Sequence, residues 1–187
     1  MRVLFMGPPG AGKGTQAALL AQRFGIVHIS TGDIFRANVS QETPLGVKAK
    51  SFMDKGEYVP DDVTNEMVRD RLTWDDAVAG FILDGYPRTV AQVLELDSML
   101  ADAGVQLDAV IEITANTDEL VERLSKRAAQ QGRSDDTPDV IRRRLEVYTE
   151  STAPLIELYA DRGILTPIDG LGDVDDVTAR LVNALAN

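Results

Sequence analysis

A phosphate-binding loop is indicated near the start of the chain, where the sequence reads Gly7-Pro8-Pro9-Gly10-Ala11-Gly12-Lys13-Gly14-Thr15. The loop follows an apolar run, residues 3–6, that has the composition of a buried strand, and a strongly helical stretch follows it. In that order, backbone N–H groups and the positive end of the helix dipole point into one concavity. Lys13 can then reach the β- and γ-phosphates of a nucleotide.

One position departs from the pattern G-x-x-x-x-G-K-[ST], because Gly14 occupies the slot of the hydroxyl residue and Thr15 follows it. A hydroxyl one residue late can meet a metal through water or contact the phosphates, so we do not assign Thr15 as a direct Mg²⁺ ligand. A plain glycine-rich turn would have no use for Lys13. A dinucleotide-binding fingerprint is disfavoured, since Thr15 stands where its third glycine would fall.

A second cluster, Asp84-Gly85-Tyr86-Pro87-Arg88-Thr89, follows the apolar run Phe81-Ile82-Leu83. Ligands of open α/β sheets bind at the carboxyl ends of the strands, so Asp84 and Lys13 are expected to face one crevice. Asp84 is the candidate for holding hydrated Mg²⁺. Gly85 and Pro87 would shape a turn that aims Arg88 into the crevice, and a capped turn with a surface arginine is the alternative.

Further arginines could converge on the same phosphates. Arg123 and Arg127 stand four residues apart on an amphipathic segment, which puts both on one helix face. Arg133 lies in a polar loop, and Arg144 lies in a long helix predicted to continue through Leu155. Each alone would be an ordinary surface arginine. Beside a phosphate loop they indicate a polyphosphate site when taken as a set: Lys13, Arg36, Arg88, Arg123, Arg127, Arg133 and Arg144.

Five apolar runs, separated by segments of helix length, must position these residues. This alternation predicts an α/β fold, a doubly wound five-stranded parallel sheet flanked by helices. The runs are residues 3–6, 27–30, 80–84, 109–113 and 164–168. Two stretches do not fit simple crossovers. Residues 30–80 are too long for one crossover and suggest a small helical subdomain, and residues 131–137 are expected to form an exposed loop.

Length and composition favour one cytoplasmic globular domain. The 187 residues are too few for two full domains, and 44% hydrophobic content indicates a packed core. No apolar run would span a bilayer, and the first residues lack the pattern of a secretory signal. Without cysteine the chain has no disulfide and no cysteine-bound zinc, and the single histidine, His28, is expected to pack at a strand end.

The net charge of −11 is expected to repel nucleic acid and anionic membranes, so neither is expected as a partner. Acidic residues concentrate in short runs, which are expected to lie at helix N-termini and on solvated faces. These runs are Asp61-Asp62, Asp75-Asp76, Asp135-Asp136 and residues 173–176. If polyphosphate binds, the basic residues must be gathered in one cleft against this overall field.

The chain resembles the adenylate kinase family over its whole length. The resemblance rests on GPPGAGKGTQ (7–16), STGDIFR (30–36), KGEYVPD (55–61), DGYPRT (84–89), GRSDD (132–136), RRRLEVY (142–148) and TAPLIELY (152–159). It implies a P-loop kinase core (1–29, 60–125 and 137–187), a mobile monophosphate-binding insertion (30–59) and a lid (126–136). The lid is short and lacks cysteine, so no structural zinc is expected.

The resemblance also implies roles for individual residues in transfer of a phosphoryl group from Mg²⁺-bound ATP to AMP, which gives two ADP. Implied on the ATP side are Gly10, Ala11, Gly12, Lys13, Gly14, Thr15, Arg123, Arg127 and Gly172. Implied around AMP are Thr31, Gly32, Arg36, Glu57, Tyr58, Val59, Gly85, Tyr86, Pro87, Arg88 and Gln92. Arg133 and Arg144 are implied to span the transferring group. Family resemblance also implies a monomer.

Two other functions stay open at this point. UMP/CMP kinases typically carry alanine at the position of Thr31 and asparagine at that of Thr89, so both residues favour AMP. A P-loop switch that hydrolyses its nucleotide would share the loop around Lys13 but would not require a second phosphate site built from Arg36 and Arg88.

Overall fold

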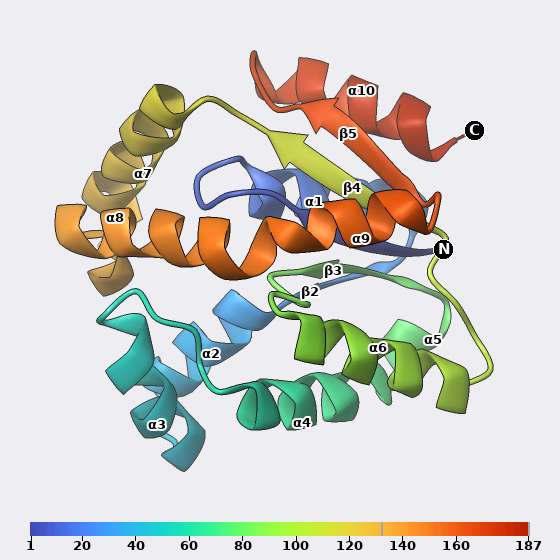
Figure 1. Cartoon of the computed structure of the whole chain (residues 1–187), viewed down its shortest axis with the longest axis horizontal. Helices are drawn as coiled ribbons and strands as arrows, with labels where there is room; N and C mark the ends of the chain where they lie inside the picture. The colour runs from blue at the N-terminus through green and yellow to red at the C-terminus, as the bar shows by residue number, and fades with distance from the viewer. Residues whose placement is uncertain (132, 187) are drawn as a thin grey trace.

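The computed structural model describes residues 1–131 and 133–186. Its centre is a parallel sheet in the order β2-β3-β1-β4-β5 (Figure 1). The predicted doubly wound α/β fold is confirmed, and each strand boundary lies within one residue of the prediction. The strands are β1 (Arg2–Met6), β2 (Val27–Ser30), β3 (Phe81–Asp84), β4 (Ala109–Thr114) and β5 (Leu165–Asp169).

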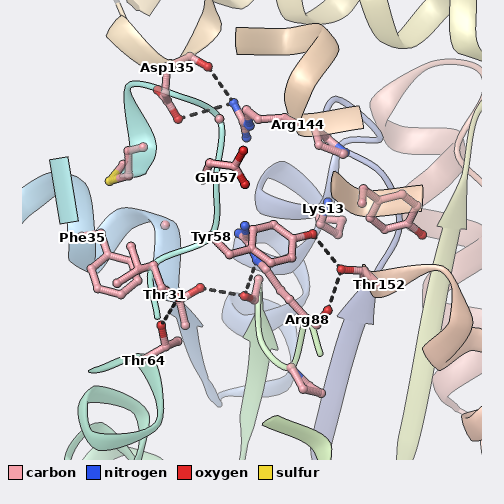
Figure 2. A pocket seen from close by; sticks show the side chains of 18 of the residues that line it. Lys13, Thr31, Phe35, Glu57, Tyr58, Thr64, Arg88, Asp135, Arg144 and Thr152 are labelled. Atoms are coloured by element: carbon pink, nitrogen blue, oxygen red, sulfur yellow. Dashed lines mark hydrogen bonds and ion pairs between the residues drawn. The ribbon is translucent and has the colours of Figure 1, made fainter. Parts of the chain in front are cut away.

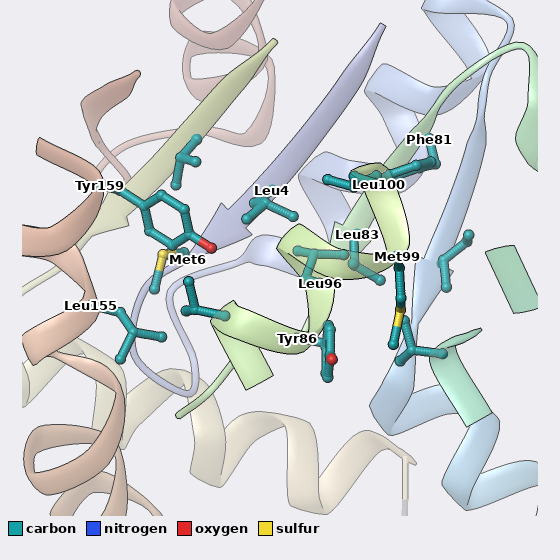
Figure 3. Close-up of a cluster of buried hydrophobic side chains, with 14 of the residues drawn as sticks. Leu4, Met6, Phe81, Leu83, Tyr86, Leu96, Met99, Leu100, Leu155 and Tyr159 are labelled. Carbon is teal, nitrogen blue, oxygen red and sulfur yellow. The ribbon is translucent and has the colours of Figure 1, made fainter. Parts of the chain in front are cut away.

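Helices cover both faces of the sheet because the side chains of β1 alternate between two buried clusters. Leu4 and Met6 join the cluster of Figure 3, to which α4 (Asp61–Leu72), α5 (Asp75–Val78), α6 (Val90–Asp102) and α9 (Pro154–Asp161) contribute. Val3 and Phe5 join the opposite cluster, with α1 (Lys13–Phe24), α7 (Thr117–Gln131) and α10 (Val174–Leu185). No helix within the described ranges is both long enough and apolar enough to cross a membrane.

The strand order places a topological switch point at β1. The chain passes from β1 to the edge strand β2, returns through β3, and then continues to β4 on the other side of β1. The carboxyl ends of β1 and β3 therefore lie side by side, with Phe5 paired to Asp84. A crevice opens at such a point in α/β sheets, and here the glycine-rich loop and Asp84 meet in it.

Two helices, α2 (Thr31–Ser40) and α3 (Pro44–Met53), form a hairpin at one end of the molecule (Figure 1). Gly46 lets them approach closely, since a Cβ there would lie 2.0 Å from the carbonyl oxygen of Asn38. The hairpin has a small buried cluster of its own, formed by Phe35, Ala49 and Val59. The sequence predicted a helical subdomain within residues 30–80. The α2–α3 hairpin is the part of it that stands apart from the sheet, and α4 packs against both the hairpin and the core.

A short 3₁₀ turn, η1 (Ser134–Asp136), leads into α8 (Pro138–Val147), a π-helical turn η2 (Tyr148–Thr152) and α9. The single long helix predicted from the region of Arg144 through Leu155 is therefore two α-helices joined by a π turn. Pro154 supplies the reason, because it cannot donate a backbone hydrogen bond and its ring would crowd the carbonyl group four residues earlier. The helix widens there, and the N–H of Ala153 donates to the carbonyl oxygen of Tyr148 at 2.9 Å.

Candidate active site

The glycine-rich loop joins β1 to α1 and leaves the N-terminus of α1 free of side-chain caps. Gly12 occupies the N-cap position with φ 95°, and no side-chain hydrogen bond caps the helix there. Gly7 has φ 134°, and a Cβ on it would lie 2.3 Å from the carbonyl oxygen of Ile113, so only glycine fits. The uncapped N–H groups and the helix dipole therefore face the crevice, as an anion site requires.

Lys13 is folded back over this loop. Its Nζ donates to the carbonyl oxygens of Gly7 at 2.8 Å and Pro8 at 3.0 Å. Burial lowers the pKa of Lys13 to about 8. The charge of Asp84 opposes this shift, whereas the charges of Arg88, Arg144 and Arg127 add to it. A phosphate in the crevice would favour the charged ammonium group and give it new acceptors.

Asp84 ends β3 beside the loop and is 8% exposed. Burial raises the pKa of its carboxyl, but His28, Lys13 and Arg88 outweigh that and hold it below its usual value, so the group is ionised at neutral pH. A Cβ on Gly14 would come within 3.7 Å of this carboxylate, so the absent hydroxyl side chain leaves room between α1 and Asp84. An ionised oxygen donor facing the phosphate loop fits hydrated Mg²⁺, which keeps several waters when it binds.

His28 belongs to the same crevice, contrary to the expectation of a merely packed histidine. Its Nε2 lies 3.7 Å from the Asp84 carboxylate, too far for a direct hydrogen bond, and is buried without a hydrogen-bond partner in the structure. The neighbouring Ile29 points into the core. Successive side chains of β2 point to opposite faces of the sheet. The apolar Ile29 could therefore have indicated that His28 faces the other side, towards the crevice.

The predicted cations gather in one cleft. It measures about 720 Å³, within the usual range of ligand pockets. All seven predicted cations line it: Lys13, Arg36, Arg88, Arg123, Arg127, Arg133 and Arg144. Gly10, Ala11, Gly12, Gly14, Thr15, Asp84 and Gly172 line it as well. In a protein of net charge −11, this concentration marks a site for a strongly anionic ligand.

Asp135 and Asp136 lie among these arginines, so the prediction that they form a solvated pair is wrong. Arg127 donates to both carboxylate oxygens of Asp136 at 2.6 Å, and Arg144 donates to the same carboxylate at 2.7 Å. The carboxylate of Asp135 lies 3.5 Å from Arg36 of α2. These carboxylates are buried because they neutralise cations that would otherwise repel one another.

Burial, followed by the charges of Arg127 and Arg88, lowers the pKa of Arg144 to about 10, although Asp135 and Asp136 act to raise it. Burial, followed by Arg36 and Arg127, also lowers the pKa of Arg133. Residue 132 of the predicted lid lies outside the described residues. Arg133 of the predicted lid and Arg144 of α8 both line the cleft.

A second cavity adjoins the cleft beneath the α2–α3 hairpin (Figure 2). Most residues of the predicted monophosphate set line it: Thr31, Gly32, Arg36, Glu57, Tyr58, Val59, Gly85, Pro87, Arg88 and Gln92. Lys13 and Arg144 line this cavity and the cleft, so the two spaces meet there. Two anionic ligands could therefore approach each other across Lys13.

Arg88 is fixed from several sides within this cavity. Its Nε donates to the carbonyl oxygen of Gly85 at 2.7 Å, and its guanidinium group stacks over the ring of Tyr58 at 4.9 Å from the centroid. The Thr31 hydroxyl also donates to Gly85 O, at 2.9 Å. Gly85 has φ 82°, and a Cβ there would lie 2.7 Å from the Thr31 hydroxyl, so the turn requires glycine.

One predicted site residue, Tyr86, lies differently from expectation, and two neighbours of the turn, Thr89 and Gln92, are bound to Asp61. Tyr86 is 1% exposed, lines neither space, and donates from its hydroxyl to Asn65 at 2.7 Å within the core (Figure 3). Gln92 lines the cavity, but its amide nitrogen donates to Asp61 and its oxygen accepts from the N–H of Arg88. Thr89 caps α6 and donates to Asp61, so it supports the turn from outside the cavity.

The loop after β5, Gly170 to Gly172, closes the far side of the cleft. Arg123 donates to the carbonyl oxygen of Gly170 at 2.9 Å, and Arg180 donates to those of Asp169 and Leu171 at 2.7 Å each. Gly172 has φ 105° and lines the cleft. A flat ligand group at this edge would meet backbone held by two guanidinium groups.

A parallel sheet with an uncapped glycine-rich loop at its switch point, an ionised aspartate on the next strand and a cationic cleft defines a P-loop nucleotide-binding protein. The second cavity points to the phosphotransferases of that class, which bind a phosphoryl acceptor beside the donor. The family model of adenylate kinase matches residues 5–164. The chain belongs to the adenylate kinase family.

Several curated relatives are similar over almost the whole chain. Adenylate kinase of Nocardioides sp. is 62% identical over 185 residues, which cover 99% of this chain and 97% of the relative. Adenylate kinase of Kocuria rhizophila is 60% identical over 98% of each chain. Adenylate kinase of Bifidobacterium longum is 55% identical and covers 99% of this chain and 100% of its own length.

Proposed function

We propose that the chain is an adenylate kinase, which transfers the γ-phosphoryl group of ATP reversibly to AMP and yields two ADP. The observation that carries this proposal is the continuity of the cationic cleft with the second cavity across Lys13 and Arg144. A protein that only hydrolysed a nucleotide would need no second anion site beside Lys13. The names of the curated relatives agree with the proposal.

ATP would occupy the cleft, and AMP the cavity under the α2–α3 hairpin. The glycine-rich loop and Lys13 would hold the ATP phosphates, with Arg123 and Gly172 nearer to the base. Thr31, Arg36 and Arg88 line the proposed AMP site. Arg133 and Arg144 would bind the transferring group, because guanidinium forks suit phosphate oxygens.

The residue set suits this chemistry. A phosphate oxygen of AMP forms a bond to the γ-phosphorus, while the bond from that phosphorus to the β–γ bridging oxygen breaks and its electrons stay on ADP. The attacking oxygen is already ionised near neutral pH, so no general base is needed. The arginines supply alignment of two polyanions and stabilise charge on the equatorial oxygens.

Mg²⁺ would accompany ATP, and Asp84 would hold its water shell. Bound there, the ion would neutralise charge on the β- and γ-phosphates. The ionised state of Asp84 and the open space beside Gly14 support this assignment. Within residues 1–131 and 133–186 no group of three or more aspartate, glutamate or histidine side chains is arranged to hold a metal by itself.

Residues 30–59 and 126–136 would form the two moving parts, the monophosphate-binding insertion and a short lid. Their separate positions on either side of the cleft support this division, as does the small buried cluster of the insertion. Closure over both substrates would exclude water from the γ-phosphate. We propose that the protein acts as a cytoplasmic monomer on free nucleotides, in keeping with its strong negative charge.

A coupled assay tests the function directly. We expect rapid, reversible conversion of MgATP and AMP into two ADP, little turnover with CMP or UMP, and negligible ATP hydrolysis without AMP. A dinucleoside pentaphosphate, which would fill both sites together, should raise the melting temperature far more than ATP does. Preference for CMP or UMP would refute the assignment of AMP, and steady ATP hydrolysis without any acceptor would refute the kinase.

A further inference from the structure

Two hydroxyl groups connect the insertion to the π turn. Tyr58 lies between α3 and α4 on residues 54–60, which we call the strap and which line the second cavity, and Thr152 is the last residue of η2 (Figure 2). Their oxygens lie 2.7 Å apart, and the Thr152 hydroxyl donates to the carbonyl oxygen of Arg88 at 2.9 Å. A carbonyl oxygen can only accept, so the single proton of Thr152 goes to Arg88. The hydroxyl of Tyr58 must therefore be the donor to Thr152.

We propose that Thr152 is a positioning residue for the phosphoryl acceptor, which fixes Arg88 directly and holds the closed insertion through Tyr58. The inference rests on the proposed function, because it assigns AMP to the cavity that these residues line. We call the chain Tyr58–Thr152–Arg88 the hydroxyl link. When the strap closes, the link forms and the ring of Tyr58 covers the Arg88 guanidinium at 4.9 Å.

The π turn explains why Thr152 is free for this role. A threonine inside an α-helix commonly donates back to the carbonyl four residues earlier, as Thr149 does to Leu145 at 3.0 Å. Thr152 donates across to Arg88 instead. It is 5% exposed, so its two partners depend on it rather than on water. Single π turns occur frequently at functional sites, and here the turn redirects one hydroxyl.

A second contact joins the strap to α8, but it contributes less to holding the strap closed. Glu57 and Arg143 form an ion pair of 2.7 Å, with both side chains more than one third exposed. Exposed ion pairs contribute little to stability and are screened by salt. The hydroxyl link is more buried and reaches Arg88 itself, so it is the contact through which strap closure and acceptor binding are coupled.

The test compares two hydroxyl deletions with a matched control. Tyr58→Phe keeps the ring over Arg88 and removes only the donor, so KM for AMP should rise about 2- to 10-fold. Thr152→Val also leaves the Arg88 carbonyl oxygen without its donor, so kcat/KM for AMP should fall about 10- to 100-fold. Thr152→Ser should restore most of the loss. Thr149→Val makes the same change on an exposed face of η2 and should leave both constants unchanged.

Two further readouts separate positioning from general damage. KM for ATP should stay within about twofold in every variant, and the double variant should lose no more than Thr152→Val alone. If Tyr58→Phe and Thr152→Val leave the AMP constants of the active enzyme unchanged, the link has no such role. Equal losses for ATP and AMP would also overturn it. If Thr152→Val does not fold, Tyr58→Phe decides alone, and an unmodified chain that makes no ADP overturns the proposed function instead.

Discussion

Replacing Asp136 by asparagine removes one charge from the centre of the arginine cluster and keeps the shape of the side chain. The carboxylate is fully buried, and Arg127 and Arg144 make three hydrogen bonds to it, of 2.6 to 2.7 Å. In Asp136→Asn an amide N–H would face the Nε–H of Arg127. Loss of one partner of a buried pair costs about 3 to 5 kcal/mol. Both arginines are partly exposed, so we expect the lower end, about 3 kcal/mol.

A loss of that size should lower the melting temperature by about 6 to 12 °C in a chain of this length. The control is Asp139→Asn, because Asp139 is 94% exposed and lies 3.5 Å from the exposed Arg142, a pair worth about 1 kcal/mol or less. Thermal and urea unfolding followed by circular dichroism measure both variants. If Asp136→Asn is no less stable than Asp139→Asn, the carboxylate does not neutralise the cluster and the reasoning fails.

Acidification provides an independent check. Burial raises the pKa of Asp136, but Arg127, Arg144 and Arg133 outweigh burial and hold it below its usual value. The native protein thus binds this proton less readily than the unfolded chain, so the stabilisation is present above about pH 4 and is lost as the pH falls through the native pKa. The stability difference between the parent and Asp136→Asn should shrink over that range. A constant difference would contradict the assignment.

Three further predictions concern the nucleotide sites. Lys13 has a native pKa of about 8, below its unfolded value of 10.5, so the free energy of unfolding should rise with pH between these values. ATP should reverse this shift, and calorimetry at pH 8 in buffers of different ionisation enthalpy should detect uptake of about half a proton, whereas no uptake would show that Lys13 is already charged. Arg88→Ala should lower kcat/KM for AMP by about 10³-fold or more while the melting temperature changes little, and unchanged kinetics would remove Arg88 from the acceptor site. Gly85→Ala should weaken AMP use as well, because the added Cβ would lie 2.7 Å from the Thr31 hydroxyl, and a crystal structure with an undisturbed turn would disprove the clash.

Much of the fold follows from local sequence, because the strands are short apolar runs buried on both faces. Val3 to Met6 are at most 3% exposed, and such a run has few alternatives to a central strand. The glycine-rich loop could also be predicted from the sequence, since Gly7 and Gly12 adopt backbone conformations that other residues rarely adopt. Asp84 followed from its place at the end of a buried strand.

The remaining features depend on contacts between distant segments. Asp135 and Asp136 look like solvated residues in the sequence, and only the approach of α7, α8 and α2 makes them counter-ions of the arginines. Tyr86 stands within a motif of site residues, yet the turn sends its ring into the core. Thr152 lies in the motif TAPLIELY, but the sequence does not indicate its role, since that role depends on a π turn that widens the helix before Pro154.

From the buried cluster of Phe35, Ala49 and Val59 we expect the α2–α3 hairpin to open as a cooperative unit of its own. This cluster is distinct from the two clusters that cover the sheet, so amide hydrogens of α2 and α3 should exchange through a local opening of lower free energy than global unfolding. The sheet and its phosphate loop would stay protected during that opening. Substitutions in the hairpin could then adjust the opening rate for a warmer or colder habitat without any change to the residues that touch phosphate.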